Sequence, residues 1–270
     1  MMRSLWTAAS GMITQQTNVD VIANNISNIN TTGFKRETPQ FKTLLYQTIQ
    51  DESTDNEGNR KPLGIQVGLG VRNSAIRSDY MQGVLSETNN QFDFAIEGQG
   101  FFMIQLPDGE TAYTRNGSFR IAVGYNENRL VNSEGYPVLD VNGEPIAFDY
   151  NMNVNNISID DIGNITYLDG SGSYQTLYRL GIAQFNNPAG LSKMSGSLLT
   201  ESEGSGNSRI EAFDNDLEGS KVASGYLESS NVDAANEMVD LIVAQRAYEM
   251  NSKAIQASDE MLQLANNIRR

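Results

Sequence analysis

The residues whose chemistry is easiest to read are a run of oxygen donors, Asp214-Asn215-Asp216-Leu217-Glu218-Gly219. Carboxylates and amides at this spacing, with a glycine at the sixth position, match the first half of a calcium-binding loop. A complete loop also needs a bidentate glutamate at its twelfth position, where this chain has Gly225. The pattern therefore predicts no calcium site, and we interpret these residues as solvated surface acids.

Catalytic side chains are equally hard to assemble. The chain contains no Cys and no His, which removes thiolate zinc sites, a cysteine nucleophile and the usual base of a catalytic triad. The glycine pairs at 68–70 and 98–100 lack the strand-turn-helix context of a dinucleotide site. Two carboxylates could form a glycosidase pair, but the sequence gives no distance between them. We expect no catalytic, cofactor-binding or metal-binding residues, and hence no enzyme.

Composition limits the partners. The 270 residues carry a formal net charge of −14, and the pI near 4.4 argues against nucleic acid or an anionic membrane surface as a partner. No apolar run approaches the roughly 20 residues that span a bilayer, so we expect no direct membrane insertion. Residues 1–13 contain Ser, Thr and Arg instead of an unbroken apolar core, so we expect no cleaved signal peptide.

Residues 230–270 predict one long helix, because neither Pro nor Gly follows Gly225. Ser230 with Asp233 is a helix start signal, and Arg269-Arg270 lie at the end where cations are favoured. The first stripe of small or apolar residues comprises Leu241, Ala244, Tyr248, Ile255, Leu262 and Ala265, with Asn251 and Ser258 completing the heptad spacing; the second comprises Val243, Ala247, Met250, Ala254, Ala257, Met261, Leu264 and Ile268. Two stripes indicate packing on more than one neighbour.

Another heptad pattern runs from Leu5, and its helix should end near Asn28, where Asn, Thr and Gly crowd together. The columns are Leu5, Met12, Val19 and Ile26, and Ala8, Gln15, Ile22 and Ile29. Residues 1–32 carry only two charged side chains, Arg3 and Asp20, which is unusual for a helix in water. Two interpretations stay open: an intramolecular coiled coil of the termini, or helices that also pack against copies of themselves in a polymer.

The middle of the chain predicts β structure, because short apolar or alternating runs separated by turn pairs extend from Ala75 to about Phe213. The strand candidates are 92–97, 101–106, 111–115, 136–141, 157–159, 165–168 and 178–185, and the turns are 107–109, 116–117, 134–135, 142–143 and 163–164. We predict an α+β fold with long N- and C-terminal helices forming a coiled-coil pair, an inserted all-β domain and an extended connecting region. The predicted domains are 1–33 plus 230–270 (helical), 34–74 plus 214–229 (connecting) and 75–213 (β-rich).

Three ordered sets of motifs resemble the bacterial flagellar rod and hook family. They are ANNISNINTTGFKR at 23–36, QGVLSETNNQFDFAIEGQGFF at 82–102 with AYTRNGSF at 112–119, and GYLESSNVDAANEMVDLIVAQRAYEMNSKAIQASDEML at 225–262. Together they cover both ends of the chain and the start of the β region. The stretches LLYQTI at 44–49 and GLGVR at 68–72 flank a segment of the kind that subunits of the distal part of the rod carry, whereas hook subunits are usually much longer in the middle.

The resemblance implies a structural subunit that is secreted through the flagellar type III export apparatus without a cleaved signal. It would polymerise into a hollow helical drive shaft that transmits torque from motor to hook and encloses the export channel. The terminal helices would form the inner tube and the β domain the outer layer. The implied partners are other copies of the chain, proximal rod subunits, hook subunits and bushing-ring proteins, and the implied location is the extracytoplasmic rod of the basal body.

The two-stripe helices and this resemblance together give the predicted assembly interface: Leu5, Met12, Val19, Ile22, Ile26, Ile29, Leu241, Val243, Ala244, Ala247, Tyr248, Met250, Ala254, Ile255, Met261 and Leu262. The segment from Glu37 to Val71 would brace one subunit against the next. Its polar centre, 51–61, cannot make a core of its own, but apolar anchors flank it on both sides: Phe41, Leu44, Leu45, Ile65, Val67 and Val71.

Other functions compete with this one. Within the family, the alternative is a proximal rod or hook-type axial subunit. Outside it, the β content and the acidic residues are compatible with an exported carbohydrate-binding or hydrolase protein of the cell wall. A coiled-coil adhesin or scaffold that stays a small oligomer is a third class.

Overall fold

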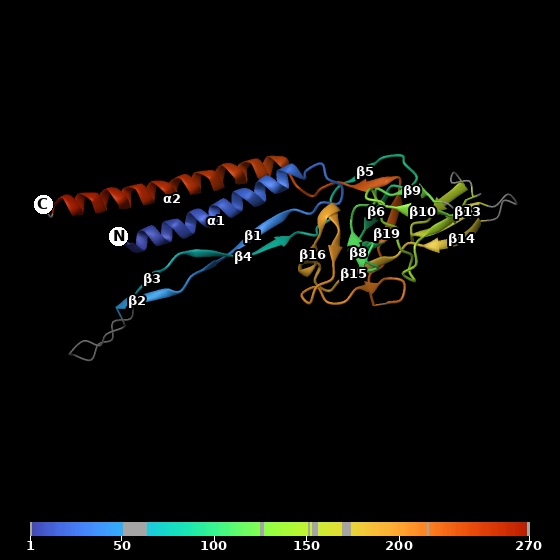
Figure 1. Ribbon diagram of the computed structural model, residues 1–270, viewed down its shortest axis with the longest axis horizontal. Coiled ribbons are helices and arrows are strands. Elements are labelled where there is room, and N and C mark those ends of the chain that lie inside the picture. Colours follow the sequence, from blue (N-terminus) through green and yellow to red (C-terminus); the bar gives the residue numbers. More distant parts are fainter. Residues whose placement is uncertain are drawn as a thin grey trace. The chain divides into compact units, whose positions relative to one another are not determined.

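A computed structural model describes residues 2–50, 64–124, 127–150, 152, 156–168, 174–214 and 216–268. Its two helices and many antiparallel strands confirm an α+β fold. The chain forms two compact units (Figure 1). Unit 1 consists of Met1–Ser27, Glu37–Ser78 and Asp233–Arg270, and unit 2 consists of Asn28–Arg36 and Asp79–Val232. The chain therefore passes between the units four times, and most of the expected connecting region lies within unit 1.

Unit 1 contains the two helices and two β-ribbons. The helices are α1 (Met2–Ser27) and α2 (Ala234–Ile268), and the strands are β1 (Glu37–Thr43), β2 (Tyr46–Gln50), β3 (Ile65–Gly68) and β4 (Val71–Ser78). β1 pairs antiparallel with β4, and β2 pairs with β3. α1 packs against α2 and also against β1 and β4 (Figure 1). Neither described helix combines the length and the apolarity that crossing a membrane requires.

The ends of the helices test the start and stop signals in the sequence. α1 ends at Ser27, next to the predicted boundary at Asn28. The predicted start of the second helix at Ser230 is wrong, because α2 begins at Ala234. Asp233 is the capping residue: its carboxylate accepts a hydrogen bond of 2.9 Å from the backbone N–H of Ala235. The Ser230 hydroxyl instead accepts a hydrogen bond from the Val232 backbone N–H, before the helix begins.

Unit 2 contains the remaining strands. The largest sheet has the order β16-β17-β8-β7-β15-β18, two further sheets have the orders β11-β10-β9 and β12-β13-β14, and β6 pairs with β19 and β5 with β20. The strands are β5 (Leu85–Glu87), β6 (Phe94–Glu97), β7 (Phe101–Gln105), β8 (Thr111–Thr114), β9 (Arg120–Val123), β10 (Glu127–Val131), β11 (Ala147–Asp149), β12 (Ile157–Ile159), β13 (Asn164–Leu168), β14 (Tyr174–Arg179), β15 (Ile182–Gln184), β16 (Ser192–Lys193), β17 (Leu199–Thr200), β18 (Arg209–Ile210), β19 (Lys221–Ser224) and β20 (Tyr226–Glu228).

The hydrophobic core of unit 2 is organised around β7. Because side chains alternate across a strand, Phe102 and Ile104 enter one buried cluster while Phe101 and Met103 enter another. Both faces of β7 are therefore covered. The larger cluster also holds Phe94, Phe119, Leu130, Ile146, Phe148 and Ile165. The apolar run at 101–106 in the sequence is explained by this central position.

Four predicted turns are confirmed as hairpin loops. Gly109, Gly135, Gly143 and Gly163 each adopt a φ between 81° and 89°, a conformation that favours glycine. The predicted strand at 136–141 is wrong. Two of these loops enclose it, and its residues make only isolated bridges such as Ile104 with Val138.

Phe102 offers a direct test of this core. Truncation of the fully buried ring in Phe102→Ala should lower the free energy of unfolding of unit 2 by about 3–5 kcal/mol. Phe213→Ala is the matched control, because Phe213 lies in the same unit with an exposed ring. The control should change stability by no more than about 0.5 kcal/mol. Chemical denaturation followed by near-UV circular dichroism measures both; equal losses would contradict the assigned core.

Candidate functional site

The seam between α1 and α2 repeats every seven residues. The Ser4 and Ser258 hydroxyls lie 3.3 Å apart. A Cβ atom placed on Gly11 would lie 3.0 Å from the Asn251 side-chain nitrogen. Two heptads further along α1, the Asn25 amide donates to the Glu237 carboxylate at 3.2 Å. Residue numbers in each pair add to the same total, so the helices run antiparallel in a fixed register.

The seam is made of small and polar residues. Ala244, which is only 1% exposed, falls opposite Asn18 in this register. Asn25 also donates to the backbone carbonyl of Glu37 and accepts from its N–H, both at 2.9 Å. The buried polar groups are thus satisfied at the end where α1 meets β1. Hydrogen bonds and close approach, more than bulky apolar side chains, define how the helices pair.

The predicted interface residues separate by exposure. Ile22 and Ala244 are buried; Leu5, Met12, Val19, Ile26, Ile29, Leu241, Ala247, Ile255 and Leu262 are half-buried; and Val243, Tyr248, Met250, Ala254 and Met261 are exposed. The first stripe of α2 supplies the seam through Ala244, Asn251 and Ser258. On α1, the column that faces α2 is Ser4, Gly11 and Asn25, one position before the predicted column from Leu5.

Most described residues of the second stripe of α2 are exposed, although Ala247 is half-buried. Val243 is 61% exposed and Met250 is 64% exposed. Exposed apolar side chains continue along this helix at Met238, Val239, Ile242, Met261 and Leu264. Many exposed apolar side chains along one helix indicate a candidate interaction surface.

The predicted bracing anchors are spread over both ribbons of unit 1: Ile65 and Val67 lie in β3, Phe41 in β1 and Val71 in β4, and Leu44 and Leu45 join β1 to β2. Leu45 is 82% exposed, and Phe41 and Ile65 are also exposed. Leu44, Val67 and Val71 are half-buried. A two-stranded ribbon has little stability of its own in water, so its apolar residues form a second candidate contact surface. The segment 51–61 that these anchors flank lies outside the described residues.

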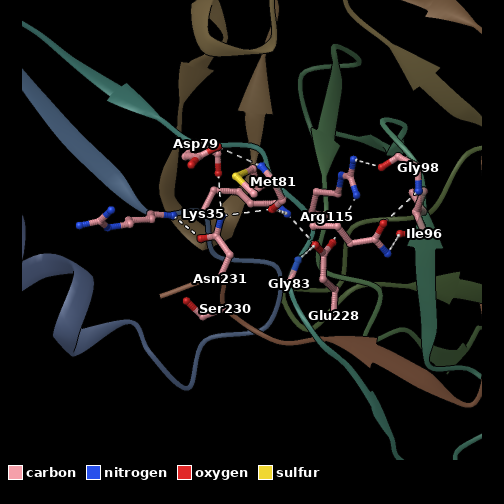
Figure 2. A network of polar contacts seen from close by, with 12 residues as sticks. Lys35, Asp79, Met81, Gly83, Ile96, Gly98, Arg115, Glu228, Ser230 and Asn231 are labelled. Atoms are coloured by element: carbon pink, nitrogen blue, oxygen red, sulfur yellow. Dashed lines mark hydrogen bonds and ion pairs between the residues drawn. The ribbon is translucent and has the colours of Figure 1, made fainter. Parts of the chain in front are cut away.

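A buried ion network in unit 2 was not predicted (Figure 2). Lys35 Nζ donates to Glu228 Oε1 at 2.5 Å and to the carbonyl oxygen of Met81 at 2.8 Å. Arg115 Nη1 donates to Glu228 Oε2 at 3.3 Å, and its Nη2 donates to the Gly98 carbonyl at 2.6 Å. The side chains of Lys35, Arg115 and Glu228 are 5%, 3% and 0% exposed. One carboxylate therefore pairs with two buried cations.

The surroundings of these charges are partly apolar. The Arg115 guanidinium carbon lies 5.1 Å from the centre of the Phe101 ring, a cation–π contact. Burial lowers the pKa of Lys35, and the Glu228 carboxylate acts in the opposite direction. Burial likewise lowers the pKa of Arg115, with Glu228 again opposing it. In both cases the Glu228 carboxylate raises the pKa and thereby opposes the effect of burial.

Asn231 extends this network. Its side-chain oxygen accepts from the Arg36 backbone N–H at 2.6 Å, and its nitrogen donates to the carbonyl oxygens of Asp79 and Met81 at 2.9 and 3.1 Å (Figure 2). Residues 36, 79 and 231 each lie within two positions of a passage between the units. Asn231 therefore ties together three segments of unit 2 that adjoin these passages.

The motifs contained a signal for this network. GFKR supplies Lys35, TRNGSF supplies Arg115, GYLESSN supplies Glu228 and QGV supplies Gly83, whose N–H donates to Glu228 at 2.8 Å. The charges in these motifs were visible, but the linear sequence does not say which charge meets which. That Lys35, Arg115 and Glu228 contact one another is seen only in the folded structure.

The acidic run at 214–219 has an ordinary structural role. Asp214 accepts from Arg209 Nε at 2.7 Å and from the Asp216 N–H at 3.3 Å. Within the described part of the chain, no group of three or more acidic side chains is arranged to hold a metal ion.

Comparison with known proteins places these features in a family. A profile described as flagellar basal body rod FlgEFG protein C-terminal matches residues 223–268, one described as flagellar hook protein FlgE/F/G D1 domain matches 95–167, and one described as flagella basal body rod protein matches 5–35. The matched regions contain α2, the strands around β7, and α1. Lys35, Arg115 and Glu228 each fall in a different one of them.

Curated relatives match over the full chain. The flagellar basal-body rod protein FlgG of Borreliella burgdorferi is 48% identical over 273 residues, which cover 100% of both chains. The proteins of the same name are 43% identical in Agrobacterium fabrum, covering 98% of each chain, and 38% identical in Bacillus subtilis, covering 100% of each. A solved Helicobacter pylori flagellar hook protein FlgE2 overlaps 62% of this chain and 47% of its own at 16% identity, with a TM-score of 0.25 that is too low to bear on the fold.

The polar seam yields a mutational test. Asn25→Ala removes three hydrogen bonds at a buried position, so it should destabilise unit 1 by about 2–3 kcal/mol. The control Gln16→Ala removes an exposed amide from the same helix and should be nearly neutral. Far-UV circular dichroism during urea titration reports the loss of helix. If both variants unfold at the wild-type urea concentration, the seam does not fix the helix pair.

Proposed function

This chain belongs to the family of flagellar basal-body rod and hook proteins, and we propose that it forms the distal rod, a hollow helical drive shaft. It is a structural subunit of the flagellar basal-body rod and lies in that structure. The proposed shaft transmits torque from motor to hook and encloses the export channel. The terminal helices form its inner tube as a coiled-coil pair, and the β-rich part forms its outer layer.

The observation that carries this proposal is the missing core of unit 1. Among the described residues of that unit, the buried apolar side chains are Ala8, Val21, Ile22 and Ala244. Two helices and two ribbons cannot be held firmly by so little apolar burial. Most of the second stripe of α2 remains exposed at the same time. Contacts with other copies would supply the area that unit 1 lacks.

The distribution of charge supports the same arrangement. Unit 1 carries 10 Lys and Arg against 12 Asp and Glu, a net charge of −2, whereas unit 2 carries 9 against 21, a net charge of −12. Like charges oppose close packing. Unit 1 is therefore suited to dense contact between copies, and unit 2 to a hydrated outer surface.

The ribbon at 37–71 gives the proposed shaft its stiffness. Its exposed anchors Leu45 and Ile65 would lie against an axially adjacent subunit and limit sliding. Further proposed partners are proximal rod subunits, hook subunits, bushing-ring proteins and the flagellar type III export apparatus. The proposed location is extracytoplasmic, reached through that export apparatus.

The exposed stripe can be tested without disturbing the monomer. Met250→Asp adds a carboxylate to a surface position, so monomer stability should change by no more than about 0.5 kcal/mol. In a polymer the same carboxylate would be buried without a partner at a cost of several kcal/mol. We expect normal folding, and loss of rod assembly and motility.

Gln256→Asp is the matched control, since it adds the same charge to an exposed polar position of the same helix. It should assemble. Sedimentation of purified protein and electron microscopy of basal bodies give the readout. If the Met250 variant polymerises to the same extent as the wild type, the second stripe is not part of the assembly interface.

Deletion of 51–61 tests the bracing segment. The deletion leaves the described anchors in place, so export and polymerisation should survive, but the rods should be more curved or more easily bent. A second variant replaces 51–61 with Gly and Ser at equal length, which separates loss of contacts from loss of spacing. Curvature measured in electron micrographs decides the question, and straight, stiff rods from both variants would reduce the segment to a spacer.

A further inference from the structure

Glu228 lies near the C-terminal end of unit 2 and contacts two segments that come much earlier in the sequence. Lys35 precedes it by 193 residues and Arg115 by 113 residues. Both cations are buried in the folded unit, and in the described chain Glu228 is the carboxylate that contacts them. Before Glu228 has reached its folded position, neither cation can be buried together with its ion-pair partner.

Main-chain bonds seat the same segment. The Gly33 N–H donates to the Glu228 carbonyl at 2.8 Å, and the Ser229 N–H donates to the Val84 carbonyl at 2.9 Å. β20 pairs antiparallel with β5. The backbone of Glu228 thus joins residue 33, while its side chain joins Lys35, Gly83 and Arg115. No other residue of β20 makes comparable links to so many separate stretches among the described hydrogen bonds.

Loss of Glu228 would reach the core directly. Arg115 follows β8 and stacks on Phe101, a fully buried residue of β7. An uncompensated guanidinium in that position is strongly unfavourable, and moving it into water would open the cluster that contains Phe101. The central sheet therefore depends on a carboxylate near the end of unit 2.

We infer that Glu228 is the closing residue of unit 2: the unit folds stably only when β20 is paired with β5, so a chain that contains Lys35 and Arg115 but ends before β20 stays unfolded in this part. During synthesis of the chain, unit 2 then cannot complete its folding until β20 has been made, when little more than α2 is still to follow. If the chain is exported as in the proposed function, this delay keeps the β-rich part from folding early. The inference itself concerns folding and does not require that function.

Amide hydrogen exchange on the purified full-length chain tests this. In Glu228→Gln, exchange at Met103 and Gln105, amides of β7 that bond outside β20, should accelerate roughly 100-fold or more, as expected from breaking a buried ion pair. The control Glu201→Gln removes a carboxylate that accepts from Tyr113 at 2.6 Å in the same unit. It should accelerate exchange at these amides by less than about 10-fold, because Glu201 is solvent-exposed.

The wild-type chain supplies a second measurement that does not depend on a variant. Under increasing denaturant, exchange at Ser229 should converge with exchange at Met103, because seating of β20 and folding of the sheet are one event. Two results would overturn the inference. One is a β7 that stays protected in Glu228→Gln; the other is a Ser229 amide that opens separately while Met103 remains closed. Both readouts are independent of rod assembly, so failure here leaves the proposed function intact.

Discussion

Two positive charges share one carboxylate in the interior of unit 2, and this pairing constrains how unit 2 is built. Lys35 and Arg115 each lose hydration on burial, which only a close, hydrogen-bonded anion offsets. Because Glu228 supplies that anion, the segments at 33–35, 83 and 226–229 must meet in one place. This requirement agrees with the nested order of the chain. Unit 2 contains residues from an early segment, 28–36, and from a later one, 79–232, and the ion network joins the two.

Unit 1 solves the opposite problem. Its helices meet through Ser4, Gly11, Asn25 and their partners, so register is specified by small residues and hydrogen bonds. Larger apolar side chains such as Val243 and Met250 are left outside. A soluble coiled coil places its bulky residues in the seam, whereas this pair presents them to the surroundings. The polar contacts thus fix the geometry of the helix pair, while most of its large apolar side chains stay available for contact with other molecules.

The sequence predicted whatever depends on local pattern. Periodicity located both helices, and glycine-containing turns located four hairpins, because heptads and positive φ leave a direct mark on residue type. It failed where distant residues decide the outcome. Asp233 replaced Ser230 as the helix cap because Asn231, which lies between them, is held by hydrogen bonds to Arg36, Asp79 and Met81. Residues 136–141 lost their ladder because two loops enclose them. The Lys35–Glu228–Arg115 network joins separate motifs, which no local window could connect.

The register of the helix pair also explains why part of α2 remains uncovered. Ser4 meets Ser258 and Gly11 meets Asn251, so Met2 falls opposite Glu260. The described α1 begins at Met2, while α2 continues to Ile268, about 12 Å further at 1.5 Å per residue. The described part of α1 therefore does not extend along that stretch, which carries the exposed side chains of Met261 and Leu264. Apolar side chains that the described partner helix leaves exposed are suited to contact with a neighbouring molecule.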